Sequence, residues 1–311
     1  MVMNEILPVT RLRQSTLKTI WQSRPLRRFR ADPASRLSIV IITILIVIAI
    51  IVAIDEHFLQ RQVITFFLSD PYTTDLRSTL LSPSLAHPFG TDHLGRDTMA
   101  RVLYATRTSI WVGLASVAFA LPIGVLLGIS SAYLGGIFDE VVMRTMDVFL
   151  TLPAIILALG LVGILGRGTS NIIIGIGIVN IPIFARLIRG SALKVKQMEF
   201  IEAARATGES GFRIVFSELL PNCLTAVTIQ ASFSIALAII WEASISFLGL
   251  GVQPPISSWG LMLSEAQSYI REAWWLSVFP GLAIMVTTLG FNLAGNAVRD
   301  ALDPRFLVVE V

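Results

Sequence analysis

The sequence is poor in charged residues and rich in long apolar stretches. Only 14% of its 311 residues are charged, against about 25% in an ordinary soluble domain. Hydrophobic residues make up 54% of the chain, and its mean hydropathy is +0.74. A soluble fold of this size could not keep so much apolar surface away from water. The composition therefore predicts a membrane protein and excludes a disordered chain.

Cysteine and histidine are scarce, which excludes further classes of protein. Cys223 is the single cysteine, so the chain cannot form an internal disulfide. His57, His87 and His93 have no metal-ligand spacing with it, and no metal site is expected. The net charge of +3 is too small for a nucleic-acid-binding surface. The phosphate-binding pattern Gly-x-x-x-x-Gly-Lys-Ser/Thr is also absent from the sequence.

Six apolar blocks are candidates for membrane spans, because about 20 apolar residues cross about 30 Å of hydrocarbon. The predicted spans are Leu37–Ile54, Ile110–Leu134, Val148–Gly166, Ile172–Ile188, Asn222–Phe247 and Leu276–Val298. Several contain proline, and Gly124 and Gly128 form a small-residue pair in the second. These features favour a kinked, closely packed bundle, and the alternative is a bundle that rocks between two states around a passage. We expect an all-α membrane protein with six transmembrane helices.

The distribution of Lys and Arg predicts the orientation. With the N-terminus inside, 17 of the 24 basic residues fall in inside segments or at the inner end of a span. Both termini are therefore expected in the cytoplasm. The predicted organisation is an N-terminal cytoplasmic segment 1–36, a first transmembrane helix 37–54, an outside loop 55–109, a five-helix core 110–298 and a cytoplasmic tail 299–311. The arginine-rich N-terminal segment is expected to lie on the anionic inner leaflet.

The most informative segment is the predicted cytoplasmic loop 194–221 within this core. Two sets of residues recur there at helical spacing: Phe200, Ala203, Ala204 and Thr207, then Phe212, Val215, Phe216 and Leu219. Gly208 is expected to end the first helix in the left-handed conformation, and Pro221 to stop the second. Two short helices of this kind fit a groove on another protein or lie flat on lipid, and periodicity favours neither.

The same loop resembles a known motif. Glu202-Ala203-Ala204, followed by Gly208 and then Leu220-Pro221, is similar to the EAA loop of permeases in bacterial ATP-binding-cassette importers. The family usually has isoleucine ten residues after the glycine, where this chain has Glu218.

Other motifs resemble one subfamily of these permeases, which serves dipeptides, oligopeptides and nickel. They are His87-Pro88-Phe89-Gly90-Thr91-Asp92 with Leu94-Gly95-Arg96-Asp97, the run from Glu242 to Gly251 with Gln253-Pro254-Pro255 and Ser258-Trp259-Gly260, Phe291-Asn292-Leu293, and the run from Arg299 to Arg305. The likeness extends from Arg28 to the C-terminal region and is closest to the second permease subunit of the pair.

The resemblance implies a type I importer permease fold in the bacterial inner membrane, with the loop 55–109 in the periplasm. It implies a permease without ATPase activity and without a bound cofactor. The implied partners are a homologous permease chain, two ATPase subunits that bind ATP and Mg²⁺, and a periplasmic or lipid-anchored substrate-binding protein. The implied substrate is a dipeptide or oligopeptide. A nickel chelate, glutathione or another peptide-like solute is the alternative, and a transporter driven by an ion gradient is a remote one.

The resemblance also assigns roles to residues of the cytoplasmic loop. Contact with the ATPase would be made by Glu202, Ala203, Ala204, Gly208, Leu220 and Pro221. For Glu202 the alternative is stabilisation of a helix dipole by its charge.

Several residues outside this loop have two interpretations each. Glu242 lies in the fifth predicted span, where an ionisable group is costly. It lines the passage or binds a peptide ammonium, or it pairs with a neighbouring helix near the outer surface. Asp92, Arg96 and Asp97 contact the binding protein, or form an ion pair within their loop that is worth little at a wet surface.

The segment 250–275 is expected to form a short helix outside the membrane. Its tryptophans, Trp259, Trp274 and Trp275, are expected to act as interfacial anchors.

Overall fold

The computed structural model of the chain describes residues 32–58, 61 and 69–302. Within these residues the regular elements are helices, and the one β-bridge joins Thr91 to Asp97. The α-helices are α3 (Pro33–His57), α5 (Thr98–Leu134), α6 (Gly136–Thr151), α7 (Ala154–Leu165), α8 (Thr169–Val195), α9 (Glu199–Ala206), α10 (Gly211–Arg213), α11 (Leu220–Phe247), α12 (Trp259–Ala266) and α13 (Trp275–Leu302). Two 3₁₀ turns, η1 (Leu76–Ser78) and η3 (Gln267–Tyr269), and a π-helical segment, η2 (Ile214–Leu219), complete the list. The arginine-rich N-terminal segment lies outside the described residues, apart from its last few positions.

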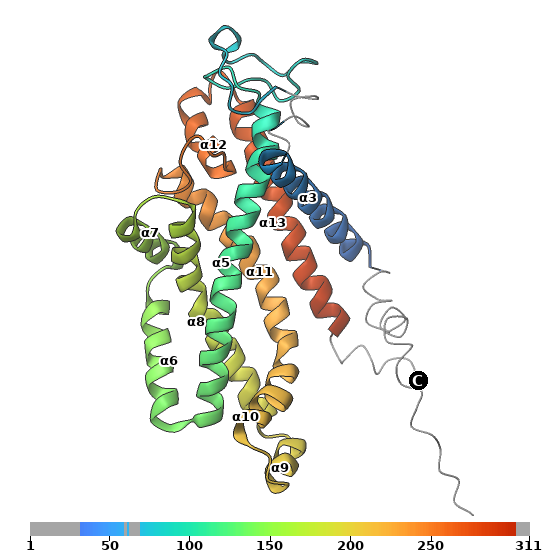
Figure 1. Ribbon diagram of the computed structural model, residues 1–311, viewed down its shortest axis with the longest axis vertical. Coiled ribbons are helices and arrows are strands. Elements are labelled where there is room, and N and C mark those ends of the chain that lie inside the picture. Colours follow the sequence, from blue (N-terminus) through green and yellow to red (C-terminus); the bar gives the residue numbers. More distant parts are fainter. Residues whose placement is uncertain (1–31, 59–60, 62–68, 303–311) are drawn as a thin grey trace, which may run out of the picture.

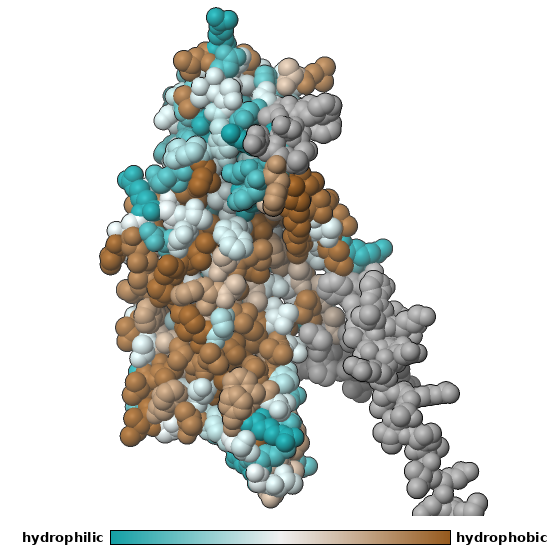
Figure 2. Space-filling model, in the orientation of Figure 1, coloured by the Kyte–Doolittle hydropathy of each residue, from teal (hydrophilic) through white to brown (hydrophobic). Residues whose placement is uncertain are grey.

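The long helices form one bundle whose two ends differ (Figure 1). Loop 69–97 and α12 lie at one end, and α9 and α10 at the other (Figure 1). These are called the α12 end and the α9 end below. Helix α5 packs on α8 and α11, α11 also packs on α13, and α3 lies along α13 and α5. In Figure 2 an apolar band covers the middle of the bundle, and hydrophilic residues gather at both ends. This is the pattern of a chain that spans a membrane.

Small residues account for the closest helix pair. A Cβ atom added to Gly128 of α5 would lie 2.2 Å from the carbonyl oxygen of Ala185 in α8. One added to Gly124 would lie 2.6 Å from Cβ of Phe184. The predicted Gly124–Gly128 pair therefore lets two backbones approach without an intervening side chain.

Five described helices are long and apolar enough to cross a membrane, and the count reaches six only if α6 and α7 together make one span. The prediction of a single third helix over Val148–Gly166 is wrong, because α6 ends at Thr151 and α7 leaves it at an angle of 93°. Pro153 explains the break. The residue before a proline avoids helical backbone angles, and Leu152 is extended, with φ −89° and ψ 141°.

The second span begins earlier than predicted. Helix α5 starts at Thr98, twelve residues before the expected Ile110, so the segment between α3 and α5 is shorter than the predicted loop 55–109. Asp97 determines this start, because its side chain accepts a hydrogen bond from the backbone N–H of Ala100 and caps the helix.

Candidate functional site

The glycine turn of the candidate coupling loop has the predicted geometry. Helix α9 ends at Ala206, and Gly208 follows with φ +78°. The N–H of Gly208 donates to the carbonyl of Arg205 (3.0 Å), and the N–H of Glu209 donates to that of Ala204 (3.1 Å). This pair of bonds is the Schellman arrangement, which needs a left-handed residue after the helix. The predicted left-handed turn at Gly208 is confirmed, and its part in an ATPase contact stays a prediction.

Helix α9 is anchored by one side chain and presents most of the others to the outside. Ile201 is fully buried against the bundle. Glu202 and Ala203 are exposed, and Ala204 is half-buried. Phe200 is 39% exposed, which is unusual for an aromatic side chain on a helix outside the apolar band. The face predicted from periodicity is therefore largely open in this chain.

The segment after Gly208 differs from the prediction. Pro221 does not stop a short helix there: one continuous helical run extends over Gly211–Phe247. Proline is tolerated because the preceding turn, η2, is a π-helix, in which the N–H of Leu220 donates five residues back to Val215.

The second predicted face is also divided. Leu219 is buried, whereas Phe212 and Phe216 are 74% and 41% exposed. The rings of Phe212 and Phe216 lie 4.5 Å apart between centroids. They form a second exposed apolar group beside α9, which joins Phe200 as a candidate contact surface.

Besides the apolar cluster that Ile201 shares with α5, Lys196 and Gly211 connect the loop to the end of that helix. The Nζ atom of Lys196 donates to the carbonyl oxygens of Ala132 (2.8 Å) and Tyr133 (2.9 Å), which belong to the last turn of α5. A Cβ atom on Gly211 would lie 2.5 Å from the hydroxyl oxygen of Tyr133. Burial lowers the pKa of Lys196, as does the nearby charge of Arg205. Both ends of the loop therefore touch the same turn of α5.

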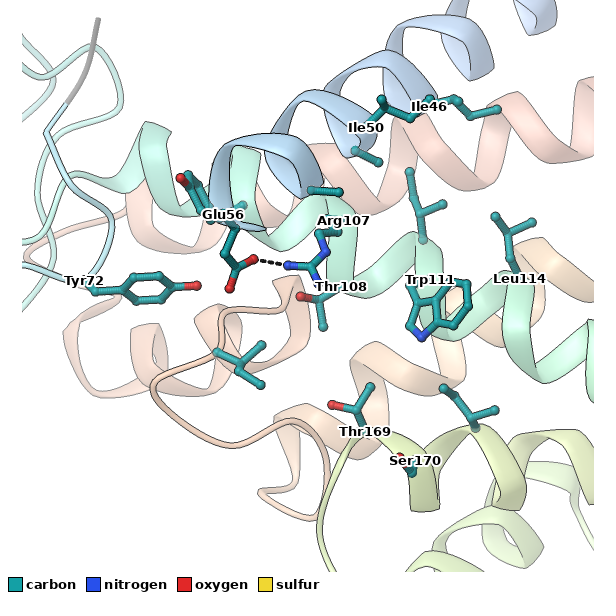
Figure 3. Close-up of a pocket in the computed structure, with 16 residues that line it drawn as sticks. Ile46, Ile50, Glu56, Tyr72, Arg107, Thr108, Trp111, Leu114, Thr169 and Ser170 are labelled. Atoms are coloured by element: carbon teal, nitrogen blue, oxygen red, sulfur yellow. Dashed lines mark hydrogen bonds and ion pairs between the residues drawn. The ribbon is translucent and has the colours of Figure 1, made fainter. Parts of the chain in front are cut away.

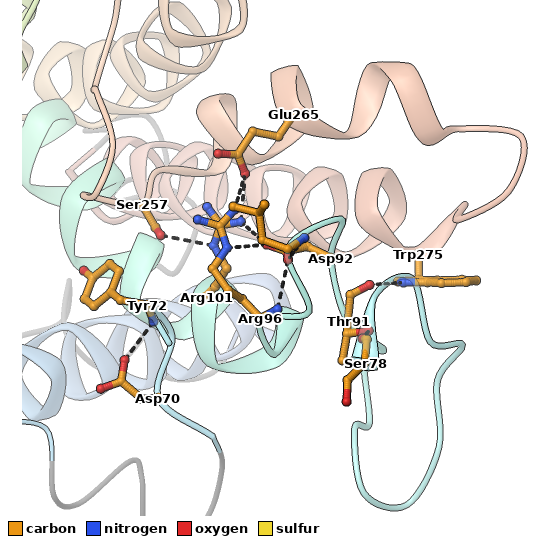
Figure 4. A network of polar contacts seen from close by, with 11 residues as sticks. Asp70, Tyr72, Ser78, Thr91, Asp92, Arg96, Arg101, Ser257, Glu265 and Trp275 are labelled. Carbon is orange, nitrogen blue, oxygen red and sulfur yellow. Dashed lines mark hydrogen bonds and ion pairs between the residues drawn. The ribbon is translucent and has the colours of Figure 1, made fainter. Parts of the chain in front are cut away.

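At the α12 end, four charged residues form a network (Figure 4). Asp92 accepts hydrogen bonds from Nε of Arg96 (2.7 Å) and Nη1 of Arg101 (2.5 Å). Glu265 of α12 accepts from the same two arginines, at 3.2 and 2.7 Å. The network joins loop 69–97 to α5 and α12, which are far apart in the sequence.

The sequence-based interpretation places this ion pair at a wet surface, but the network is buried. Asp92 is 4% exposed, Arg96 8% and Arg101 2%. Burial alone would raise the pKa of Asp92, but the charges of Arg101 and Arg96 outweigh it and the pKa lies below its usual value. Asp97 is 1% exposed and accepts a hydrogen bond at 2.8 Å from Nδ1 of His87, whose tautomer decides the proton position. Contact of Asp92, Arg96 or Asp97 with a binding protein stays a prediction, because all three residues are buried in ion pairs within the chain.

Asp92, His93 and Glu265 bring potential metal ligands within 4.8 Å of one another. No spacing in the sequence indicated this group, because Glu265 is distant in the chain. Both carboxylates already accept hydrogen bonds from arginines, whose positive charges oppose a cation at the same place. We therefore interpret the group as part of the ion-pair network.

The tryptophans at this end differ from the predicted anchors. Trp259 is fully buried, and its Nε1–H donates to the carbonyl of Val102 (3.1 Å). Trp275 is 5% exposed and donates to the carbonyl of Thr91 (3.1 Å). Trp274, at 53% exposure, alone among the three is placed as an interfacial anchor would be. The predicted short helix in this segment is present as α12; its place outside the membrane stays a prediction.

Glu242 is fully buried in α11. The hydroxyl of Ser246 donates to its Oε1 atom (2.8 Å), whereas its buried Oε2 atom, with Ser109 and Ser258 nearby, has no hydrogen-bond partner among the described residues. The carboxyl group thus lies where α11, α5 and the start of α12 meet. Lining of a passage by Glu242 stays a prediction.

Comparison with known proteins agrees with this arrangement. Residues 120–308 match the family described as the binding-protein-dependent transport system inner membrane component. The chain belongs to this family. It is therefore a permease subunit of an ATP-binding-cassette transport system, and the resemblance drawn from its motifs is confirmed. The family description and the apolar helices together imply a multi-pass protein of the bacterial inner membrane.

Individual relatives are similar over most of the permease. It is 44% identical over 236 residues to the probable D,D-dipeptide transport system permease protein DdpC of Escherichia coli, covering 76% of this chain and 79% of the relative. It is 43% identical over 232 residues to the dipeptide transport system permease protein DppC of Alkalihalophilus pseudofirmus, covering 75% and 76%. It is 40% identical over 279 residues to the glutathione transport system permease protein GsiD of E. coli, covering 90% and 89%.

Proposed function

We propose that this permease carries dipeptides or oligopeptides across the bacterial inner membrane as part of an ATP-driven importer. The relatives named for D,D-dipeptide and dipeptide transport support this substrate class. The glutathione permease relative, which matches 90% of this chain, favours glutathione as the second candidate. Glutathione is itself a small peptide, so both candidates share an ammonium group, carboxylates and amide bonds. A nickel chelate is the remaining alternative.

The proposed complex contains this chain, a homologous permease, two ATPase subunits and a substrate-binding protein in the periplasm or anchored to lipid. ATP and Mg²⁺ would bind to the ATPase subunits, because this sequence has no phosphate-binding loop of its own. In this proposal the α9 end, both termini and the ATPases lie in the cytoplasm, and the α12 end faces the binding protein.

The observation that supports coupling to ATPase subunits is the open face of α9, beside a loop that touches α5 at both ends. Glu202 and Ala203 would contact the ATPase, with Phe200 and Phe212 beside them. Closure of the two ATPases around ATP would displace α9, and Lys196 would pass that displacement to the last turn of α5. ATP can shift the inward-open and outward-open populations only by its differential affinity for the two states.

The turn at Gly208 offers a direct test of this coupling. A Cβ atom there would meet nothing within 4 Å, so a substitution acts through the backbone angle alone. Valine in the left-handed conformation costs about 1–2 kcal/mol, whereas asparagine visits that conformation readily. We expect Gly208→Val to reduce both ATP-driven peptide uptake and co-purification of the ATPase. Gly208→Asn, the matched control, should stay close to the original protein.

Two results would contradict the proposal. Full uptake by Gly208→Val would show that the turn does not shape the ATPase contact. Purification of the chain without an ATPase, together with uptake driven by an ion gradient, would instead support a secondary transporter. The substrate class is tested separately, by asking whether dipeptides or glutathione, loaded on the binding protein, stimulate the ATPase of the assembled complex.

A further inference from the structure

A cavity of about 660 Å³ lies between α3, α5 and the start of α8, away from both the coupling loop and the buried network (Figure 3). Its walls come from one face of α3, the first half of α5 and the first turns of α8. The proposed function assigns nothing to it.

The cavity changes from polar to apolar along its length. At one end, Glu56 of α3 forms an ion pair with Arg107 of α5, near the hydroxyl of Tyr72 (Figure 3). At the other end, Ile46 and Leu114 line it (Figure 3). A site of this kind matches a molecule with a charged head and a hydrocarbon tail.

The position of the ion pair in the sequence indicates its depth in the membrane. Glu56 follows the uncharged block of α3, which ends at Ile54, and Arg107 precedes the apolar stretch of α5. Both charges therefore fall where hydrocarbon gives way to lipid headgroups. Trp111, a cavity-lining residue that is 60% exposed, lies one helical turn further into the apolar stretch. Tryptophan is enriched at this boundary.

We propose that this cavity binds one phospholipid whose headgroup carries a phosphate and a primary ammonium, as in phosphatidylethanolamine. The phosphate would bind Arg107 and the ammonium would bind Glu56, while an acyl chain would follow α3 and α5 past Ala49 and Leu114. Two complementary charges on the protein face two on the lipid, so binding leaves no charge unmatched.

The same ion pair disfavours other occupants. An anionic lipid would place its excess negative charge beside the carboxylate of Glu56. An apolar helix of another protein would cover a pair whose side chains are 34% and 33% exposed, and removing such charges from water is costly. A zwitterionic lipid replaces the lost water with headgroup contacts.

The test measures which lipids stay with the assembled complex. The complex is purified in mild detergent from membranes containing phosphatidylethanolamine and phosphatidylglycerol, and retained lipids are counted by native mass spectrometry. We expect one phosphatidylethanolamine per permease chain, at least tenfold preferred over phosphatidylglycerol. Glu56→Gln should reduce that preference about tenfold. Ala49→Trp, which fills the apolar end, should remove the retained lipid, and Ile44→Trp, on an exposed part of the same helix outside the cavity, should not.

Equal retention of the two lipids would overturn the proposal, as would equal retention by Ala49→Trp and Ile44→Trp. A cross-link from Ile50→Cys to the second permease chain would assign the cavity to a protein helix instead. Glu56→Gln leaves the cavity shape unchanged and keeps the test decisive if the tryptophan variant does not assemble. None of these outcomes depends on the transported substrate.

Discussion

Replacing Asp92 by asparagine is expected to loosen the α12 end of the permease. Asp92 is 4% exposed and binds two guanidinium groups, and it also accepts hydrogen bonds from the backbone N–H groups of Leu94 and Arg96. An amide has nearly the same shape, but it removes the negative charge and can turn an NH₂ group toward the arginines. The change thus isolates the charge from the packing.

The loss of stability in Asp92→Asn depends on the hydrogen bonds that the two arginines keep. Breaking a buried ion pair by removing one partner costs about 3–5 kcal/mol. Glu265 still accepts hydrogen bonds from both Arg96 and Arg101, so the low end of that range, about 3 kcal/mol, is expected. At about 1.4 kcal/mol per factor of ten, local opening should become on the order of 100-fold more frequent.

Hydrogen exchange reports this opening directly, because the backbone of loop 69–97 is held by bonds across the network. The N–H of Leu80 donates to the carbonyl of Asp92, and the N–H of Asp92 donates to that of Arg96. Both amides should exchange on the order of 100-fold faster in Asp92→Asn. Glu272→Gln, the same chemical change at an exposed position near α12, is the control. Exchange within threefold of that control would show that the ion pairs do not hold the loop.

Three further predictions follow from other contacts. The pKa of Asp92 in the folded protein lies below its ordinary value of 3.8, so its contribution to the stability of the loop should be complete above that pH and be lost as the pH falls below it. Hydrogen exchange measured against pH should show this dependence in the original protein and lack it in Asp92→Asn. Lys196→Met removes two charged hydrogen bonds from the last turn of α5, worth about 1–3 kcal/mol. It should lower uptake per ATP hydrolysed, whereas Lys194→Met, at an exposed neighbouring position, should not. An equal ratio of uptake to hydrolysis in the two variants would contradict this. Gly128→Ala forces a methyl group to 2.2 Å from a carbonyl of α8 and should destabilise the bundle by about 1–3 kcal/mol in thermal unfolding, whereas Gly160→Ala, which meets nothing within 4 Å, should not.

The sequence was sufficient to predict helices that cross a membrane, because uncharged blocks of this length have few other structures. It was less reliable at helix ends. The start of α5 depends on the cap provided by Asp97, a residue that the sequence places within the predicted loop 55–109. The break before Pro153 could not be seen in the hydropathy, because apolar residues continue across it while the helical backbone angles are interrupted there.

Local chemistry predicted the turn at Gly208, since a glycine after a helical pattern needs only neighbouring residues to form a Schellman turn. Contacts between distant segments were not predictable in the same way. Arg101 meets Glu265 across 164 positions, and Lys196 meets the last turn of α5 across more than 60. The one available signal was an arginine close to the apolar block of α5, which needs a partner when it is buried.

The two ends of the permease use charge differently, and this difference bears on how motion passes through the bundle. At the α12 end, carboxylates and guanidinium groups bind one another out of water, so loop 69–97, α5 and α12 are held as one unit. At the α9 end, Glu202 and Arg205 are exposed, and the loop is held by buried apolar residues, Ile201 among them, that form one cluster with residues of α5 and α8, and by the hydrogen bonds of Lys196. Helix α5 runs between the two ends and packs closely on α8 around Gly128. A push at the α9 end would therefore reach the α5–α8 pair through this cluster and through Lys196. Because the far end of that pair is locked by the buried network, we expect Asp92→Asn to change coupling as well as local exchange, although Asp92 is at the opposite end of α5 from the ATPase contact.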